Sequence, residues 1–67
     1  MNTRGKILYH LRQAEDALDD AVGHYAIAFE LGEGKPPSLT AHFPLVVEML
    51  QESKKYLEKI RTDTAQE

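Results

Sequence analysis

Apolar residues recur at every third or fourth position through the first half of the chain. This spacing places their side chains on one face of a helix and forms a seam like that of a coiled coil. Large residues alternate with alanines along the seam, which lets a second helix approach closely. The pattern predicts a helix over residues 3–31 that pairs with another helix. The seam consists of Ile7, Leu11, Ala14, Leu18, Ala21, Tyr25 and Ala28.

The second half carries a similar series that includes Phe43, Val46, Leu50, Leu57 and Ile60. Pro44 suits the first turn of a helix and disfavours helical geometry at the residue before it, so this series predicts a helix over residues 44–62. The polar residues 63–67 are expected to fray.

Two glycines and two prolines separate the two series. Gly32 or Gly34 can adopt the left-handed conformation that ends a helix, and Pro36 and Pro37 cannot continue it. Residues 32–43 are therefore predicted to form a loop. Within it, Leu39 and Phe43 are expected to cover the end of the first helix, which is apolar on almost every side.

These elements predict one all-α domain over residues 1–67, a two-helix antiparallel hairpin. At 67 residues, a single core rarely supplies more than roughly 3–5 kcal/mol, and the absence of cysteine excludes disulfide reinforcement. Each helix also carries an apolar stripe wider than one helix can cover, with Leu8 and Phe29 on the first and Met49 and Tyr56 on the second. We therefore expect two hairpins to form a homodimeric four-helix bundle.

The alternating leucine and alanine seams of this short chain resemble those of the Rop-type RNA-binding hairpins, which dimerise into antiparallel four-helix bundles. The resemblance covers the seam pattern, and the Gly-Pro-Pro segment is longer than the tight turn of that family. It implies a bundle in which the two turns lie at opposite ends. The charges favour the same orientation, because it would bring Arg4, Lys6 and Arg12 near acidic residues at the partner's turn.

Composition narrows the classes of partner. A net charge of −3 gives no general attraction to nucleic acid or to an anionic membrane. No apolar run approaches the ~18–20 residues of a membrane span, and no signal peptide is evident. The sequence therefore favours a cytoplasmic protein.

The sequence favours a non-enzymatic interaction module that binds itself and presents a surface to another protein. The expected partner surface comprises Ile27, Leu31, Leu39 and Phe43. A two-helix chain leaves little volume for a polar pocket, so no catalytic residue and no cofactor is predicted.

Nucleic-acid binding is the main alternative. Arg4, Lys6 and Arg12 could contact phosphates at the open end of the hairpin, and Tyr9 could stack on a base. Acidic neighbours and a sequence pI near 5.5 disfavour a dedicated nucleic-acid-binding domain.

The sequence supports two enzymatic functions only weakly. Asp20 and His24 have half the ligands of a metal site, but no Glu-x-x-His pair accompanies them, so no metal is predicted. The spacing of Arg4 and His10 is similar to that of the HEPN-type ribonucleases, in which such a pair acts on the RNA phosphate, but two residues at this spacing are a weak signal.

Overall fold

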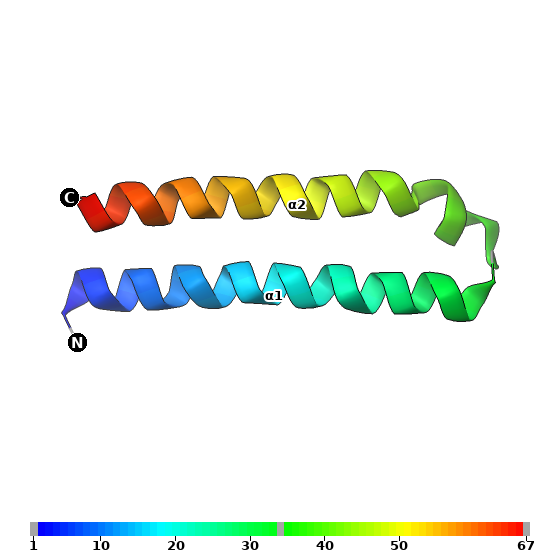
Figure 1. The fold of residues 1–67 in the computed structure, drawn as a ribbon, viewed down its shortest axis with the longest axis horizontal. Coiled ribbons are helices and arrows are strands. Elements are labelled where there is room, and N and C mark those ends of the chain that lie inside the picture. The colour runs from blue at the N-terminus through cyan, green and yellow to red at the C-terminus, as the bar shows by residue number, and fades with distance from the viewer. Residues whose placement is uncertain (1, 34, 67) are drawn as a thin grey trace.

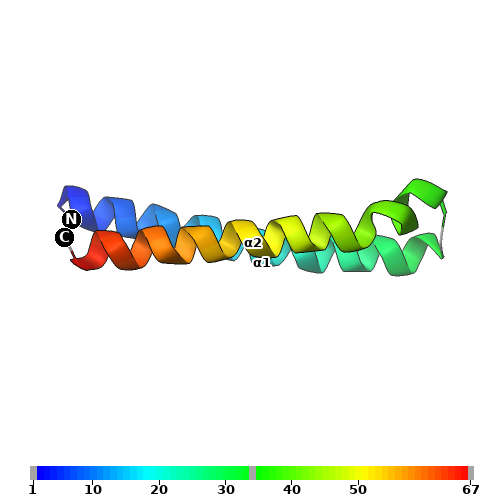
Figure 2. The ribbon, with the colours of Figure 1, turned by 90° about the horizontal axis from the view of Figure 1, so that it is seen from above.

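The protein is an all-α hairpin of two long helices that lie side by side and run in opposite directions (Figures 1 and 2). The computed structural model describes residues 2–33 and 35–66. Helix α1 spans Thr3–Gly32, and helix α2 spans Pro37–Gln66. The hairpin measures 47 × 18 × 11 Å, so it is a thin rod and not a globule. The predicted fold class is confirmed.

Local hydrogen bonds satisfy backbone groups at both ends of α1. The Asn2 side chain caps the first turn, where it accepts a hydrogen bond from the Gly5 backbone N–H at 2.7 Å. At the other end Glu33 adopts the left-handed conformation, with φ 49° and ψ 41°. Gly32 was expected in this role but lies inside the helix, and Gly34 lies outside the described residues.

Helix α2 begins at Pro37 and not at Pro44, so the prediction of a loop over residues 32–43 was wrong for its second half. Pro37 suits the first helical position, because that residue needs no backbone N–H partner. Pro44 lies inside the helix, where it cannot donate to the carbonyl four residues earlier. The first turns of α2 accordingly bend away from the axis of the remainder (Figure 2).

The predicted frayed tail was also wrong over residues 63–66, since α2 continues to Gln66, and residue 67 lies outside the described residues. Thr64 donates its hydroxyl to the Ile60 carbonyl at 2.7 Å, and the Lys59 ammonium lies 3.4 Å from the Asp63 carboxylate. These contacts one turn apart support the last turns of the helix.

An aromatic cluster holds the turn end of the hairpin together. The Phe43 ring lies 5.1 Å from that of Tyr25 and 4.4 Å from that of Phe29, measured between centroids. Leu39 packs so closely on Gly32 that a Cβ added there would lie 2.8 Å from its Cδ2 atom. Leu39 and Phe43 therefore pack on the apolar end of α1 as predicted, but from a helix and not from a loop. This packing offsets the cost of a proline within α2.

The helices contact each other along a line rotated from the predicted seams. Most predicted seam residues are half-buried, whereas Ile7, Ala28 and Ile60 are exposed. The half-buried seam residues are Leu11, Ala14, Leu18, Ala21 and Tyr25 on α1, and Val46, Leu50 and Leu57 on α2. The contact line also includes the next positions around each helix, which are Leu8, Glu15, Val22 and Phe29 on α1, and Val47, Lys54 and Arg61 on α2.

Candidate functional site: an open apolar face

The hairpin does not enclose a core of its own. Within residues 2–33 and 35–66, no apolar side chain is fully buried, and the one buried residue is Glu15, which is 4% exposed. Half-buried leucines and aromatics line the contact between the helices, but each remains open to solvent on one side. The single hairpin therefore leaves in water much of the apolar area whose burial normally stabilises a fold.

One side of the hairpin is charged. Arg61 donates to the Glu15 carboxylate from Nε at 2.7 Å and from Nη2 at 3.3 Å. One turn further along α1, the Lys54 ammonium donates to both oxygens of Asp19 at 2.9 Å. The hydrogen bond to Glu15 raises the pKa of Arg61, and that to Asp19 raises the pKa of Lys54. These pairs fix which flanks of α1 and α2 face each other.

The opposite side of the hairpin is apolar and largely open to solvent, although Ala14, Ala21 and Val46 are half-buried there. Because the ion pairs occupy one side, the residues at seven-residue spacing on the other flank of each helix lie together on the second side. We call this side the apolar face. It consists of Ile7, Ala14, Ala21 and Ala28 on α1, and Val46, Met49, Ser53, Tyr56 and Ile60 on α2. Its large residues come mainly from α2 and its small ones from α1.

The exposed area is larger than a compact monomer of this mass would have. The chain exposes 5148 Å², whereas a compact protein of 7.6 kDa exposes roughly 4,300 Å². The excess of roughly 850 Å² is close to the area that one partner contributes to a protein–protein interface of standard size. The chain as a whole therefore exposes more surface than a compact monomer of its mass, by an amount comparable to one side of a standard interface.

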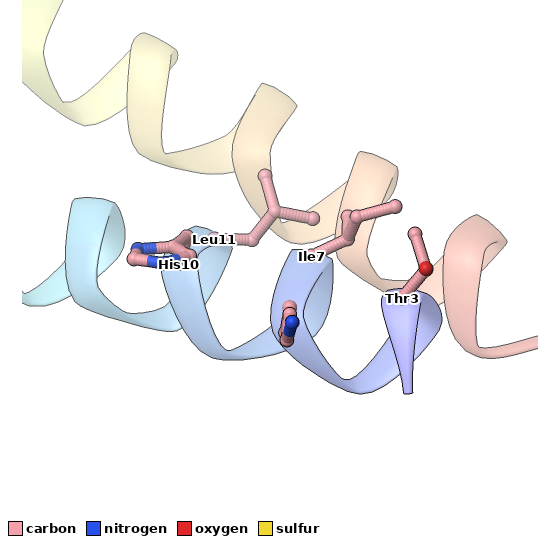
Figure 3. A pocket seen from close by; sticks show the side chains of 5 residues that line it. Thr3, Ile7, His10 and Leu11 are labelled. Atoms are coloured by element: carbon pink, nitrogen blue, oxygen red, sulfur yellow. The ribbon is translucent and has the colours of Figure 1, made fainter. Parts of the chain in front are cut away.

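An open cleft marks the N-terminal end of this face. It has a volume of about 390 Å³ and is lined by Thr3, Lys6, Ile7, His10 and Leu11. In Figure 3, Ile7 and Leu11 project from α1 on the side of α2, with Thr3 and His10 beside them. All five lining residues belong to α1, so the cleft is a surface hollow and not a pocket between the helices.

The structure does not gather the predicted partner surface. Ile27 and Leu31 are exposed, and Leu31 is the more open of the two at 79%. Leu39 and Phe43 are instead half-buried against Gly32, Tyr25 and Phe29. Their role in binding a partner stays a prediction.

The basic residues proposed for nucleic-acid contact do not line one common cleft. Lys6 lines the cleft of the apolar face. Arg12 lines a second cleft, on the charged side, together with Gly5, Leu8, Tyr9, Arg61 and Ala65. Arg4 lines neither of these clefts. Tyr9 and Arg12 therefore share a surface, but Arg4 and Lys6 do not join it.

Other candidate chemistry is sparse in the part of the chain that the structure describes. That part contains no group of three or more His, Cys, Asp or Glu residues arranged to hold a metal ion. Asp20 and His24 are both exposed. His10 contacts the Tyr9 ring, 5.2 Å away between centroids. Neither α1 nor α2, within the described residues, is both long and apolar enough to cross a membrane.

The sequence indicates that the acidic stretch around Glu15 lies beside the basic stretch that ends at Arg61, but it did not place Glu15 inside the helix contact. Glu15 interrupts the apolar column of Leu8, Val22 and Phe29, and this interruption was the available signal that a charge enters the helix contact. Its partner lies 46 positions away, and the spacing within one helix gives no information on such a pair.

Comparisons with known proteins found no relative. No protein-family model matches the chain, and no curated protein or solved structure matches it significantly. The open apolar face is therefore the feature of the chain that bears on its function.

Proposed function

We propose that this chain is a non-enzymatic, self-associating interaction module, in which the apolar faces of two copies close on each other to form a four-helix bundle. The observation that carries the proposal is the contrast between the two sides of the hairpin. One side is closed by ion pairs. The other leaves large side chains such as Met49, Tyr56 and Ile60 exposed beside small ones. A second copy would enclose both helices and supply the missing core.

Self-association accounts for the position of the predicted seams. In a four-helix bundle the inward positions of each helix contact two neighbours, and not one. The seam from Ile7 to Ala28 would then face the bundle axis, while Leu8, Glu15 and Phe29 contact α2 of the same chain. The seam residues that the hairpin leaves exposed are those that a second hairpin would cover. The cytoplasm stays the predicted location.

The proposal is tested by the mass in solution over a dilution series. Light scattering should give about twice 7.6 kDa, and circular dichroism should report a helical chain at the same concentrations. A helical chain whose mass stays at 7.6 kDa at every concentration would refute self-association. A chain that loses helix as it dissociates would support it, because the dimer then supplies the stability.

Nucleic-acid binding is retained as a second candidate because Tyr9 and Arg12 line one cleft on the charged side. Arg61 also lines this cleft, but its guanidinium is engaged with Glu15. Binding of a single-stranded RNA that weakens steeply with salt, and that is lost in Arg12→Gln, would support this candidate. Unchanged weak binding in Arg12→Gln would exclude this cleft as the site.

A further inference from the structure

The apolar face is bordered by one free flank on each helix. The free flank of α1 comprises His10, Ala17, His24 and Leu31, at seven-residue spacing next to Ile7 and the alanines. The free flank of α2 comprises His42, Met49, Tyr56 and Asp63, next to Val46 and Ile60. Because the other flanks already meet within the hairpin, the free flanks are the surfaces that neighbouring helices of a bundle would contact.

The ion pair of Asp19 with Lys54 sets the register between these flanks. Ala17 lies two residues before Asp19, and Tyr56 lies two residues after Lys54, so the two share one level of the antiparallel hairpin. By the same register, His24 is level with Met49. At the ends, Leu31 is level with His42, and His10 with Asp63.

We infer that a second copy of the chain binds with its turn at the same end, so that α1 of each copy packs on α2 of the other. The inference rests on the proposed self-association and specifies its geometry. A two-fold axis parallel to the helices keeps every residue at its own level. It would therefore bring Ala17 to the partner's Tyr56 and His24 to the partner's Met49. The size match is clearest at the first of these pairs, where the large Tyr56 of α2 meets the small Ala17 of α1.

The opposite arrangement, with the turns at opposite ends, gives a poorer fit. There α1 packs on the partner's α1 and α2 on the partner's α2. With the two-fold axis at the middle of α1, near Ala17, residues at that level meet their own copies. Ala17 would face the partner's Ala17 and leave a gap, while Tyr56 would face the partner's Tyr56 and crowd the interface. Side chains of equal size would thus meet at the centre of both the α1–α1 contact and the α2–α2 contact.

Opposite charges would favour turns at opposite ends only if Arg4, Lys6 and Arg12 acted together at one interface. Arg12 lines the cleft beside Arg61 on the charged side of the hairpin, away from the apolar face. Only Lys6 lines the cleft on the apolar face. The size match along the free flanks therefore decides the orientation.

Disulfide trapping tests the arrangement directly, because the natural chain contains no cysteine. We would mix His24→Cys and Met49→Cys chains, unfold and refold them together, and oxidise them mildly. The mixed disulfide should exceed each homodisulfide by about tenfold, since cysteines whose Cα atoms lie more than about 7 Å apart cannot be joined. Asp16→Cys mixed with Lys55→Cys is the matched control, because both residues lie outside the apolar face and should give no excess of the mixed product.

Ala17→Cys alone gives the opposing readout. With the turns at the same end, the two copies of residue 17 lie on diagonally placed helices, so a covalent dimer should not accumulate. Rapid formation of that dimer, with no excess of the mixed product between residues 24 and 49, would overturn the inference and leave self-association intact. A monomeric mass for the uncrosslinked chains would instead refute the proposed self-association itself.

A size swap provides a second, independent measurement. Ala17→Tyr and Tyr56→Ala should each weaken the dimer, and the double variant should recover about tenfold or more of the lost affinity, because it restores one large residue opposite one small residue. Additive weakening in the double variant, in chains that remain helical, would show that the two positions do not meet and would overturn the inference.

Discussion

Tyr56→Ala separates the stability of the hairpin from the stability of the dimer. Tyr56 is 66% exposed, so its truncation removes little from the contacts between α1 and α2. Full burial of such a side chain stabilises a fold by about 1.5–3 kcal/mol. Roughly two thirds of this amount is not yet gained in the single hairpin and would be gained when the dimer buries Tyr56. A two-fold dimer contains the residue twice. We therefore expect the dimer to lose about 2–4 kcal/mol, which weakens the dissociation constant roughly 30- to 1,000-fold.

Sedimentation equilibrium over a range of concentrations measures this loss, with circular dichroism to establish that the variant is folded. Tyr9→Ala is the matched control, because it removes the same side chain from a site that is 52% exposed and lies outside the apolar face. The control should leave the dissociation constant nearly unchanged. Equal effects of the two substitutions would show that the apolar face does not form the interface.

The remaining predictions concern the hairpin itself. Gly23→Ala should raise the free energy of unfolding by about 0.8–1 kcal/mol in urea titrations, because a Cβ at Gly23 meets nothing within 4 Å and alanine favours the helix. Phe43→Ala should lower it by about 2 kcal/mol, roughly half the value for a fully buried phenylalanine, since Phe43 is half-buried between two rings. The raised pKa of Lys54 means that its pair with Asp19 contributes fully below the ordinary lysine value of 10.5 and is lost as the pH rises through the higher folded value. Melting temperatures should accordingly fall less at alkaline pH in Lys54→Arg than in the natural chain.

The two helices could be predicted because their apolar spacing is a property of each helix alone. The start of α2 could not, because Pro44 is locally a helix-start signal and the contacts that extend the helix backward are tertiary. Phe43 packs on Tyr25 and Phe29, and Leu39 packs on Gly32, across the turn. Such contacts routinely override local preference.

The candidate site was predictable in outline but not in position. The column of Leu11, Leu18 and Tyr25 is shared by the predicted seam and the observed contact, so the spacing identified the apolar side of α1 correctly. It could not show which neighbouring column faces α2. That choice depends on Glu15 and Arg61, which are too far apart in sequence for helical periodicity to relate them.

The charged pair within the helix contact has a consequence for specificity. If α2 packed on the other flank of α1, the Glu15 carboxylate would lose the two hydrogen bonds from Arg61. A buried carboxylate without its partner is strongly destabilising, whereas an apolar column would tolerate either flank. The ion pair thus makes the two flanks of α1 unequal and confines α2 to one of them. Ile7 and Ala28 are then left exposed on the other side, and Ala14 and Ala21 only half-buried, so close packing favours another helix there.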